Sequence, residues 1–320
     1  MVTIGMPTFN REWSLPRVLD SVLALDYERK RIRICIVDNF STDGTMSIVE
    51  DFRSKYESEY ERVIVLAARS NISQARNMAL KEAAGSDYIF FLDSDILAPP
   101  DTLKRLIEDF KLYPRVGIAS LPWDHRNARK RAGFLYGAFA APPGPHIAYK
   151  VGNGCNLVSM EAAREVGPFN EKLRVHEDSE LCYRLRKKGF KIVCDFSSEG
   201  THLREIRVNS MFYLSLMKDS AETYSQLISR GSILHMVKVA SSVVLVASFL
   251  LLLLVRDLPA GAFFAGALVF AAWLNSSPAA LDDGIHVKLL YRPLIGVLMT
   301  LATVAISGLV LFRVPSRRRE

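Results

Sequence analysis

The sequence predicts an α/β domain with a mostly parallel sheet, followed by a membrane region of apolar helices. Short apolar runs alternate with segments of helical periodicity as far as about residue 120, as expected for strands and covering helices of a parallel sheet. The chain has 320 residues, of which 49% are hydrophobic, and the hydrophobic excess lies after residue 232. A pair of acids, Asp93 and Asp95, directly follows one of the apolar runs.

The predicted elements follow in order along the chain. Apolar runs predict strands at residues 2–6, 31–37, 62–66, 87–92 and 116–120, and Pro7 is expected to end the first. Helical spacing predicts helices at about 15–25, 45–56, 71–85 and 103–113. The alternation breaks after Pro122. Beyond that point we expect a strand at 152–158, helices at 160–166 and 178–188, and a last strand at 189–194.

The second half of the chain divides by composition. We expect residues 1–205 to form the α/β domain, 206–232 a helical connector at the membrane surface, and 233–320 a transmembrane region. Segments 233–255 and 293–312 are long enough to span a bilayer, whereas 258–274 is short. The alternative for the apolar segments is buried helices of a soluble domain, and the alternative for the connector is a plain packing helix.

Orientation in the membrane is left open by the charges. With the first domain on the cytoplasmic side, three spans place Arg317, Arg318 and Arg319 outside, against the tendency of basic residues to face the cytoplasm. Either the short segment is re-entrant or packed against a partner, or the rule does not hold for this protein. The position of the C-terminus and the contribution of these segments to a homo-oligomer stay undecided at this stage.

The net charge of +7 and the pI of about 9.2 come from basic clusters. Such clusters beside membrane spans bind anionic lipids, and no nucleic-acid motif accompanies them, so we expect no nucleic-acid partner. The four cysteines form no Cys-x-x-Cys motif and are interpreted as reduced packing thiols in a cytosolic domain. The first seven residues are too short an apolar stretch for a signal peptide.

Asp93-Ser94-Asp95 is the motif around which we build the candidate site. It follows a central strand, and open α/β sheets bind ligands at the carboxyl ends of their strands. Two neighbouring acids repel each other unless a cation lies between them. Mg²⁺ or Mn²⁺ prefers hard oxygen ligands and often bridges carboxylates to substrate phosphates. Alone, Asp-x-Asp is a weak signal, because acids are common turn residues.

Other polar clusters follow the neighbouring parallel strands: Thr8, Asn10 and Arg11; Asp38; and Asn71 with Arg76. Their convergence at one edge of the sheet predicts a nucleotide pocket. Asp38 is expected to accept a hydrogen bond from a base N–H. Arg76, early in its helix, is expected to bind a phosphate. Taken singly, Asp38 is equally well an ordinary turn acid and Arg76 a surface ion pair.

Five motifs resemble, in order and spacing, those of the family 2 glycosyltransferases with the GT-A fold. They lie at residues 5–11, 37–45, 71–77, 91–95 and 177–178, and the resemblance covers about residues 2–202. It implies a GT-A domain, the fold of Rossmann-like nucleotide-diphospho-sugar transferases. It also implies an enzyme that uses a nucleotide-diphosphate sugar, needs Mg²⁺ or Mn²⁺ and inverts the anomeric centre. In one departure, the family's Asp-Asp-Gly-Ser loop reads Asp38-Asn39-Phe40-Ser41, so the second acid is absent.

The resemblance also implies roles for single residues. Asp178 corresponds to the general base, and the metal ligands would be Asp93, Asp95 and His202. The nucleotide-sugar-binding residues would be Pro7, Thr8, Asn10, Arg11, Asp38, Asn71, Arg76, Asp93 and Ser94. The acceptor side would include Gly152, Asn153, Asn156 and Glu177. Asp178 heads a predicted helix, whose dipole favours the ionised carboxylate; the alternative is that Asp178 or Glu177 only caps that helix.

A membrane tether suits an acceptor with a long apolar chain. The arrangement is similar to that of polyprenyl-phosphate glycosyltransferases, so a lipid-phosphate or lipid-linked acceptor is expected. A glycan or glycolipid acceptor, and a non-catalytic membrane-tethered nucleotide-sugar-binding protein, are the alternatives. A processive synthase is disfavoured because no Gln-x-x-Arg-Trp motif is present. The Gly-rich loop and lysine of a nucleotidyltransferase are absent, and a dehalogenase-type phosphatase needs its acid pair on the first strand.

Overall fold

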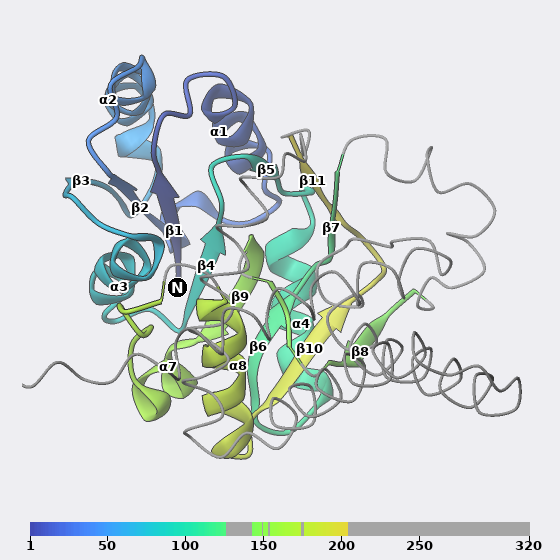
Figure 1. Ribbon diagram of the computed structural model, residues 1–320. Coiled ribbons are helices and arrows are strands. Elements are labelled where there is room, and N and C mark those ends of the chain that lie inside the picture. The colour runs from blue at the N-terminus through green and yellow to red at the C-terminus, as the bar shows by residue number, and fades with distance from the viewer. Residues whose placement is uncertain (126–142, 149, 153, 174–175, 204–320) are drawn as a thin grey trace, which may run out of the picture. The chain divides into compact units, whose positions relative to one another are not determined.

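A mixed eight-stranded sheet forms the centre of the first of the two compact units into which the chain divides (Figure 1). The computed structural model describes residues 1–125, 143–148, 150–152, 154–173 and 176–203. The strand order is β3-β2-β1-β4-β9-β6-β10-β8. The bounds are β1 Val2–Thr8, β2 Ile32–Asp38, β3 Arg62–Ala67, β4 Tyr88–Leu92, β6 Val116–Ser120, β8 Pro145–Ile147, β9 Cys155–Ser159 and β10 Lys191–Asp195.

The N-terminal half of this sheet is parallel, as predicted. β1 pairs in parallel with β2 and β4, and β2 pairs in parallel with β3. The first four strands lie within two residues of their predicted bounds. The expectation that Pro7 ends the first strand is wrong: β1 continues to Thr8. Its pairing with β4 stops at Gly5, so Pro7 lies beyond the part of β1 that is bonded on both sides.

The second half of the sheet is mixed: β10 pairs in parallel with β6, but the other pairings are antiparallel, which the sequence did not predict. β9 lies antiparallel between β4 and β6, and β8 is antiparallel to β10. A second sheet of order β5-β11-β7 lies beside it, made of β5 Ile96–Leu97, β7 Trp123–His125 and β11 Gly200–His202. These strands are two to five residues long, too short for periodicity to predict their partners.

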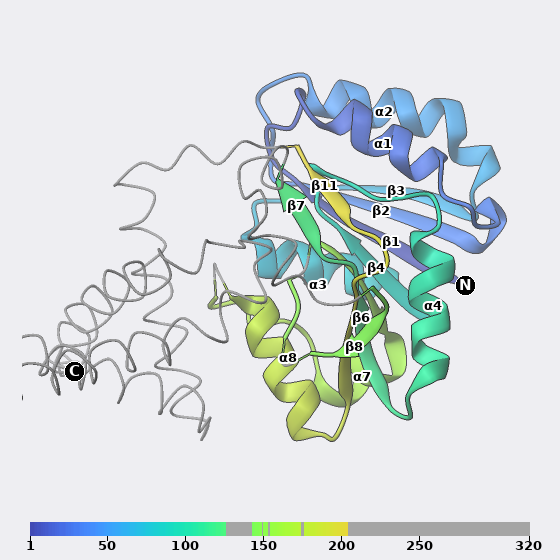
Figure 2. The same ribbon diagram turned by 90° about the vertical axis from the view of Figure 1, so that its right-hand side faces the viewer.

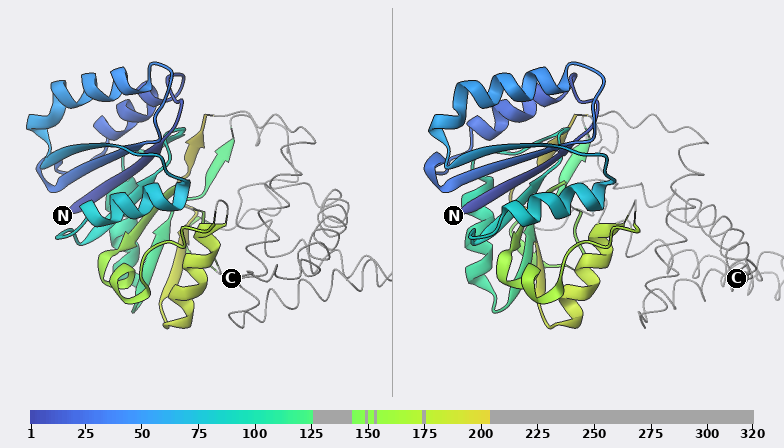
Figure 3. Two further views of the ribbon diagram at one scale, coloured as in Figure 1. Left: turned by 60° about the vertical axis from the view of Figure 1, so that its left-hand side comes forward. Right: turned by 90° about the vertical axis from the view of Figure 1, so that its left-hand side faces the viewer.

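Helices cover both faces of the large sheet and produce three layers (Figures 2 and 3). One face carries α1 Leu15–Leu23, α2 Thr45–Tyr56 and α4 Thr102–Leu112. The other carries α3 Ile72–Glu82, α7 Met160–Val166 and α8 Glu177–Lys187. Each face has its own cluster of buried apolar side chains. The predicted apolar face of α1 is confirmed, since Leu15, Val18, Leu19 and Val22 are buried.

Gly5 allows α3 to pack closely against β1. A Cβ atom at Gly5 would lie 2.9 Å from the Cβ of Ala79 on α3, closer than two such atoms approach. The contact holds α3 tightly on the sheet and sets the position of its first turns. Those turns carry the side chains that were predicted to line the site.

The predicted connector at 206–232 and the three membrane segments lie outside the described residues. Among the residues that the structure describes, no helix is both long and apolar enough to cross a bilayer.

Candidate functional site

Arg76 joins two parts of the chain that are far apart in sequence. Its side chain, on α3, is only 3% exposed. Nη2 donates to Oδ1 of Asp93 at 2.9 Å, and Nη1 donates to Oε1 of Glu177, the first residue of α8. The structure thus corrects one interpretation of Arg76: its ion pair is not at the surface but forms the centre of a buried cluster. The expected contact with a phosphate stays a prediction.

The charges in this cluster explain why Arg76 can be buried. Burial alone would lower the pKa of Arg76, but Asp93 and Glu177 raise it overall and keep the guanidinium charged. Burial raises the pKa of Glu177, and Arg76 opposes that shift. Burial likewise raises the pKa of Asp93, and the neighbouring Asp95 adds to it. The Asp93 side chain is 32% exposed, so this carboxylate also reaches the surface of the site.

Asp95 lies beside a second arginine and a histidine. Its Oδ2 is 3.4 Å from Nη2 of Arg11, and its Oδ1 is 3.7 Å from Nε2 of His202. The small sheet brings His202 here, because β11 pairs with β5 directly after Asp95. The backbone N–H of Leu203 donates to the carbonyl of Asp95 at 2.8 Å. The predicted meeting of Asp95 and His202 is therefore present in the structure.

The donor atoms suit a divalent ion that also takes ligands from its substrate. Within the described residues no three His, Cys, Asp or Glu side chains are arranged to hold a metal by themselves. Mg²⁺ and Mn²⁺ commonly use one or two carboxylates and complete their shell with phosphate oxygens and water. Asp95 and His202 can supply such protein ligands. Asp93 can add its second carboxylate oxygen, Oδ2, because Arg76 binds Oδ1. When all are ionised, four acids and two arginines at the site carry a net charge of −2, which a divalent ion balances. They are Asp93, Asp95, Glu177 and Asp178, with Arg11 and Arg76.

Asp178 stands in the first turn of α8, next to the cluster. It is half-buried, and it contributes to the electrostatic field on Arg76. Its Oδ1 accepts a hydrogen bond from the backbone N–H of the next residue, Ser179, at 2.5 Å, which is a local contact within α8. The residue before α8, His176, has a φ of 59°, so a left-handed turn sets the direction in which α8 starts.

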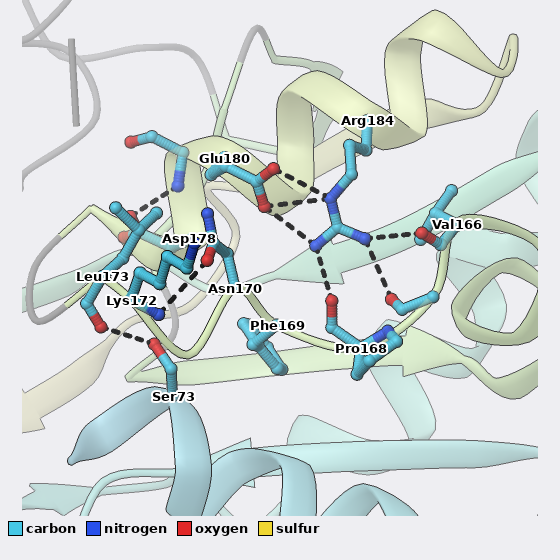
Figure 4. Close-up of polar contacts among 12 residues, drawn as sticks. Ser73, Val166, Pro168, Phe169, Asn170, Lys172, Leu173, Asp178, Glu180 and Arg184 are labelled. Carbon is cyan, nitrogen blue, oxygen red and sulfur yellow. Dashed lines mark hydrogen bonds and ion pairs between the residues drawn. The ribbon is translucent and has the colours of Figure 1, made fainter. Parts of the chain in front are cut away.

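Arg184 fixes α8 in place (Figure 4). It pairs with Glu180 at 2.9 Å and donates to the carbonyls of Val166, Gly167 and Pro168. The segment between α7 and α8 is bound to α3, since Oγ of Ser73 donates to the carbonyl of Leu173 at 2.8 Å. The helix that carries Asp178 is thus bound to α7 and α3 before any ligand arrives.

Asp38 is engaged within its own loop. It is fully buried, and its two carboxylate oxygens accept from the N–H and the hydroxyl of Ser41 at 2.8 and 2.5 Å. Asn10 is likewise occupied: its N–H donates to Oγ of Ser41, and its Oδ1 accepts from the N–H of Thr42, both at 2.9 Å. Asn10 therefore holds the loops after β1 and β2 together. Asp38 closes its own loop, in agreement with the turn-acid alternative.

Buried polar atoms without a protein partner mark the same edge of the sheet. They include Thr8 Oγ1 and Arg11 Nε after β1, Ser70 Oγ just before α3, and Arg76 Nε. A buried polar atom without a partner is unfavourable, so these atoms are suited to bind a ligand or water. Ser70 was missed from the sequence, although it directly precedes the Asn71 motif.

Three other predicted site residues, Asn71, Pro7 and Ser94, take part in local structure. Asn71 caps α3, accepting from the N–H of Gln74 at 2.9 Å in a full capping box. Pro7 lies within β1 opposite Val37, and the carbonyl of buried Ser94 accepts from Oγ of Ser14. These three residues have structural roles here.

The predicted acceptor-side segment lies beside Asp93. The N–H of Asp93 donates to the carbonyl of Gly154 at 3.1 Å, and Nδ2 of Asn156 donates to the carbonyl of Gly152 at 2.9 Å. Asn153 lies outside the described residues. Glu177 binds Arg76 through its carboxylate, and its expected place on the acceptor side stays a prediction.

Comparison with known proteins agrees with this geometry. Residues 3–140 match the model of Glycosyl transferase family 2. Succinoglycan biosynthesis protein ExoA of Rhizobium meliloti (strain 1021) is 32% identical over 170 residues, which are 50% of each protein. Poly(ribitol-phosphate) beta-N-acetylglucosaminyltransferase TarS of Staphylococcus aureus is 32% identical over 102 residues, 32% of this chain and 17% of TarS. The chain thus spans half or less of the length of these relatives.

Solved structures show the fold. Mannosyltransferase PcManGT from Pyrobaculum calidifontis, in complex with GDP-Man and Mn²⁺, has a TM-score of 0.64 at 20% identity, over 97% of this chain and 87% of that one. The S. aureus TarS 1–349 structure has a TM-score of 0.55 at 17% identity, over 96% of this chain and 82% of that one. The architecture is therefore the GT-A fold, and residues 3–140 match the family 2 model.

Proposed function

We propose that the chain is a membrane-bound, inverting glycosyltransferase that moves a sugar from a nucleotide-diphosphate sugar to a lipid-phosphate or lipid-linked acceptor. One observation carries the catalytic part of this proposal. Arg76 binds Asp93 and Glu177 at once, which places Asp178 next to the acids that would face the donor diphosphate. Asp93, on the side of the sugar donor, and Asp178, the candidate base, therefore belong to one cluster, although about 85 residues separate them in sequence.

On the donor side, Asp93, Asp95 and His202 would hold Mg²⁺ or Mn²⁺, which supplies positive charge to the departing diphosphate. Arg11, 3.4 Å from Asp95, adds a cation at the same place. Because its Nε atom is buried without a partner, Arg11 also has a hydrogen-bond donor left for a phosphate oxygen. The unpartnered hydroxyls of Thr8 and Ser70, at the ends of β1 and β3, would provide further contacts to the donor along this edge of the sheet.

On the acceptor side, Asp178 would take the proton of an attacking hydroxyl as the nucleophile approaches the sugar. Inversion needs this attack to come from the face opposite the leaving diphosphate. The ion pairs of Arg76 fix the start of α8 relative to the end of β4, and so fix the candidate base relative to the metal-binding acids. If the acceptor is a lipid phosphate, its oxygen is already anionic, and Asp178 would orient it instead of deprotonating it.

The membrane part of the proposal rests on the apolar segments between residues 233 and 312. They favour a multi-pass protein of the cell membrane, and they offer a surface for a homo-oligomer. The four cysteines, which form no Cys-x-x-Cys motif, favour a catalytic domain in the cytoplasm. The names of the relatives favour a second candidate acceptor, a glycan or a polyol-phosphate polymer, because ExoA serves succinoglycan biosynthesis and TarS acts on poly(ribitol-phosphate).

Donor turnover by the full-length protein tests the catalytic assignment. A panel of UDP- and GDP-sugars with Mn²⁺ identifies the donor, and Asp95→Ala and Asp178→Ala should each lower turnover by about 100-fold or more. Asp178→Ala should leave nucleotide affinity nearly unchanged, whereas Asp95→Ala should weaken the Mn²⁺-dependent part of it. Asp51→Ala, an exposed acid on α2, is the matched control. Unchanged turnover in both site variants would end the proposal.

The acceptor is tested separately. Transfer to a polyprenyl phosphate in detergent supports the lipid-phosphate acceptor. Transfer to a soluble glycan or a polyol-phosphate polymer, with none to the lipid, replaces it by the second candidate.

A further inference from the structure

The loop after β2 carries an exposed aromatic ring on an unfavourable backbone. Phe40 has a φ of 53°, a left-handed conformation that is free for glycine and costly for a bulky residue. It is 53% exposed and belongs to neither of the two buried apolar clusters. Packing within the domain therefore does not account for a phenylalanine here, and a strained, exposed ring points to a contact with a ligand.

The position of this loop fits the base of a nucleotide. β2, β1 and β4 are consecutive neighbours in the sheet, so the end of β2 lies two strand spacings from the acids after β4, about 10 Å at about 4.8 Å per strand (Figure 1). A diphosphate held at Asp95 leaves a ribose to cover that interval. The buried, unpartnered hydroxyls of Thr8, at the end of β1, and Ser70, after β3, lie on the same side of Asp95 as this loop. They would bind a nucleoside that extends from the diphosphate toward the loop.

The polar groups of the loop are largely committed to holding it in place. Both carboxylate oxygens of Asp38 accept from Ser41. The N–H of Asn39 donates to the carbonyl of Thr8 at 3.0 Å, and its Oδ1 accepts from the N–H of Ser70 at 2.9 Å. The loop is thus rigid and presents Phe40, but it offers few free groups that could distinguish one base from another.

We propose that Phe40 binds the base of the nucleotide donor by stacking. The inference rests on the proposed function and specifies how that site selects its donor. An aromatic ring contacts the π-face that every base has, and it does not read the pattern of donors and acceptors on the base edge. UDP and GDP should therefore bind within about tenfold of each other, the larger purine more tightly.

Calorimetry on the full-length protein with Mn²⁺ tests this, using UDP, GDP and base-free inorganic pyrophosphate as probes. Phe40→Gly should weaken UDP and GDP at least about fivefold and leave pyrophosphate unchanged. It should not lower the melting temperature, because glycine accepts the left-handed backbone without strain. Phe40→Tyr keeps a ring and should bind like the native protein. Leu112→Ala removes an exposed apolar side chain at the end of α4 and is the control.

The outcomes separate this inference from the proposed function. A native protein that binds no nucleoside diphosphate ends the proposed function and the inference with it. Native binding with unchanged affinities in Phe40→Gly overturns the inference alone. Equal weakening of pyrophosphate, or a lower melting temperature in Phe40→Gly, assigns the ring to loop structure and also overturns it. A preference above about 100-fold between UDP and GDP shows hydrogen-bond readout and overturns the predicted tolerance.

Discussion

Removal of the Arg76 charge should destabilise the α/β domain strongly, because it leaves two acids without their partner. Arg76 pairs with Asp93 and Glu177, and the Glu177 side chain is only 9% exposed. Breaking a buried ion pair by removing one member costs about 3–5 kcal/mol, since the remaining charge stays desolvated. We therefore expect Arg76→Met to lower the free energy of unfolding by about that amount.

A double-mutant cycle distinguishes this cause from simple loss of packing. When both charges of a buried pair are replaced, the desolvation cost largely disappears. Arg76→Met combined with Glu177→Gln should thus be about 1–3 kcal/mol more stable than the sum of the two single changes predicts. Urea unfolding of the full-length protein, followed by tryptophan fluorescence, measures each step.

The exposed pair Lys104–Asp26, with its atoms 2.6 Å apart, provides the control. Its side chains are more than half exposed, so Lys104→Met should cost less than about 1 kcal/mol. A cost of Arg76→Met as small as that of Lys104→Met, or strict additivity in the cycle, would refute the reasoning that a buried charge cluster holds α8 on the sheet.

Two further changes test local features of the domain. Asp109 on α4 is buried, one of its oxygens has no partner, and burial raises its pKa to about 7, with Asp195 adding to the shift. A raised carboxyl pKa means that stability is present at low pH and is lost between about pH 4 and pH 7. A shift from 3.8 to about 7 corresponds to about 4 kcal/mol at 1.36 kcal/mol per pKa unit, and we expect roughly half of it. The stability of Asp109→Asn relative to the native protein should therefore rise by about 2 kcal/mol across that interval. A pH-independent difference in urea unfolding contradicts this. Asn71→Ala removes the cap of α3 and should cost about 1 kcal/mol, while Asn71→Asp keeps the accepting oxygen and should cost less; equal losses for the two variants in thermal unfolding would contradict the capping role.

Much of the site could be located from sequence because it lies at the carboxyl ends of parallel strands. The apolar runs before Thr8, Asp38 and Asp93 are long enough to be recognised, and parallel strands necessarily bring their carboxyl ends to one edge. The approach of His202 to Asp95 also agrees with the structure. What the pattern could not predict was how each polar side chain is used once it reaches that edge.

Asp38 and Arg76 show the difference most clearly. Both are polar residues in the predicted places, and for each the sequence left two roles open: a ligand contact, or a local role as a turn acid (Asp38) or in a surface ion pair (Arg76). In the fold, Asp38 accepts from Ser41 three residues away, and Arg76 pairs with Glu177 a hundred and one residues away. Hydrogen-bond partners of this kind depend on distances in space, which a linear pattern of residue types does not contain.

The sequence by itself determined the α/β class, the positions of the main strands and the edge at which polar residues gather, because these follow from local periodicity and strand direction. Only the tertiary structure decided that β9 runs antiparallel between β4 and β6, and that Arg76 ties the start of α8 to β4. Short strands and buried ion pairs are selected by long-range packing and by the desolvation of charge. Both act between residues that are neighbours only after the chain has folded.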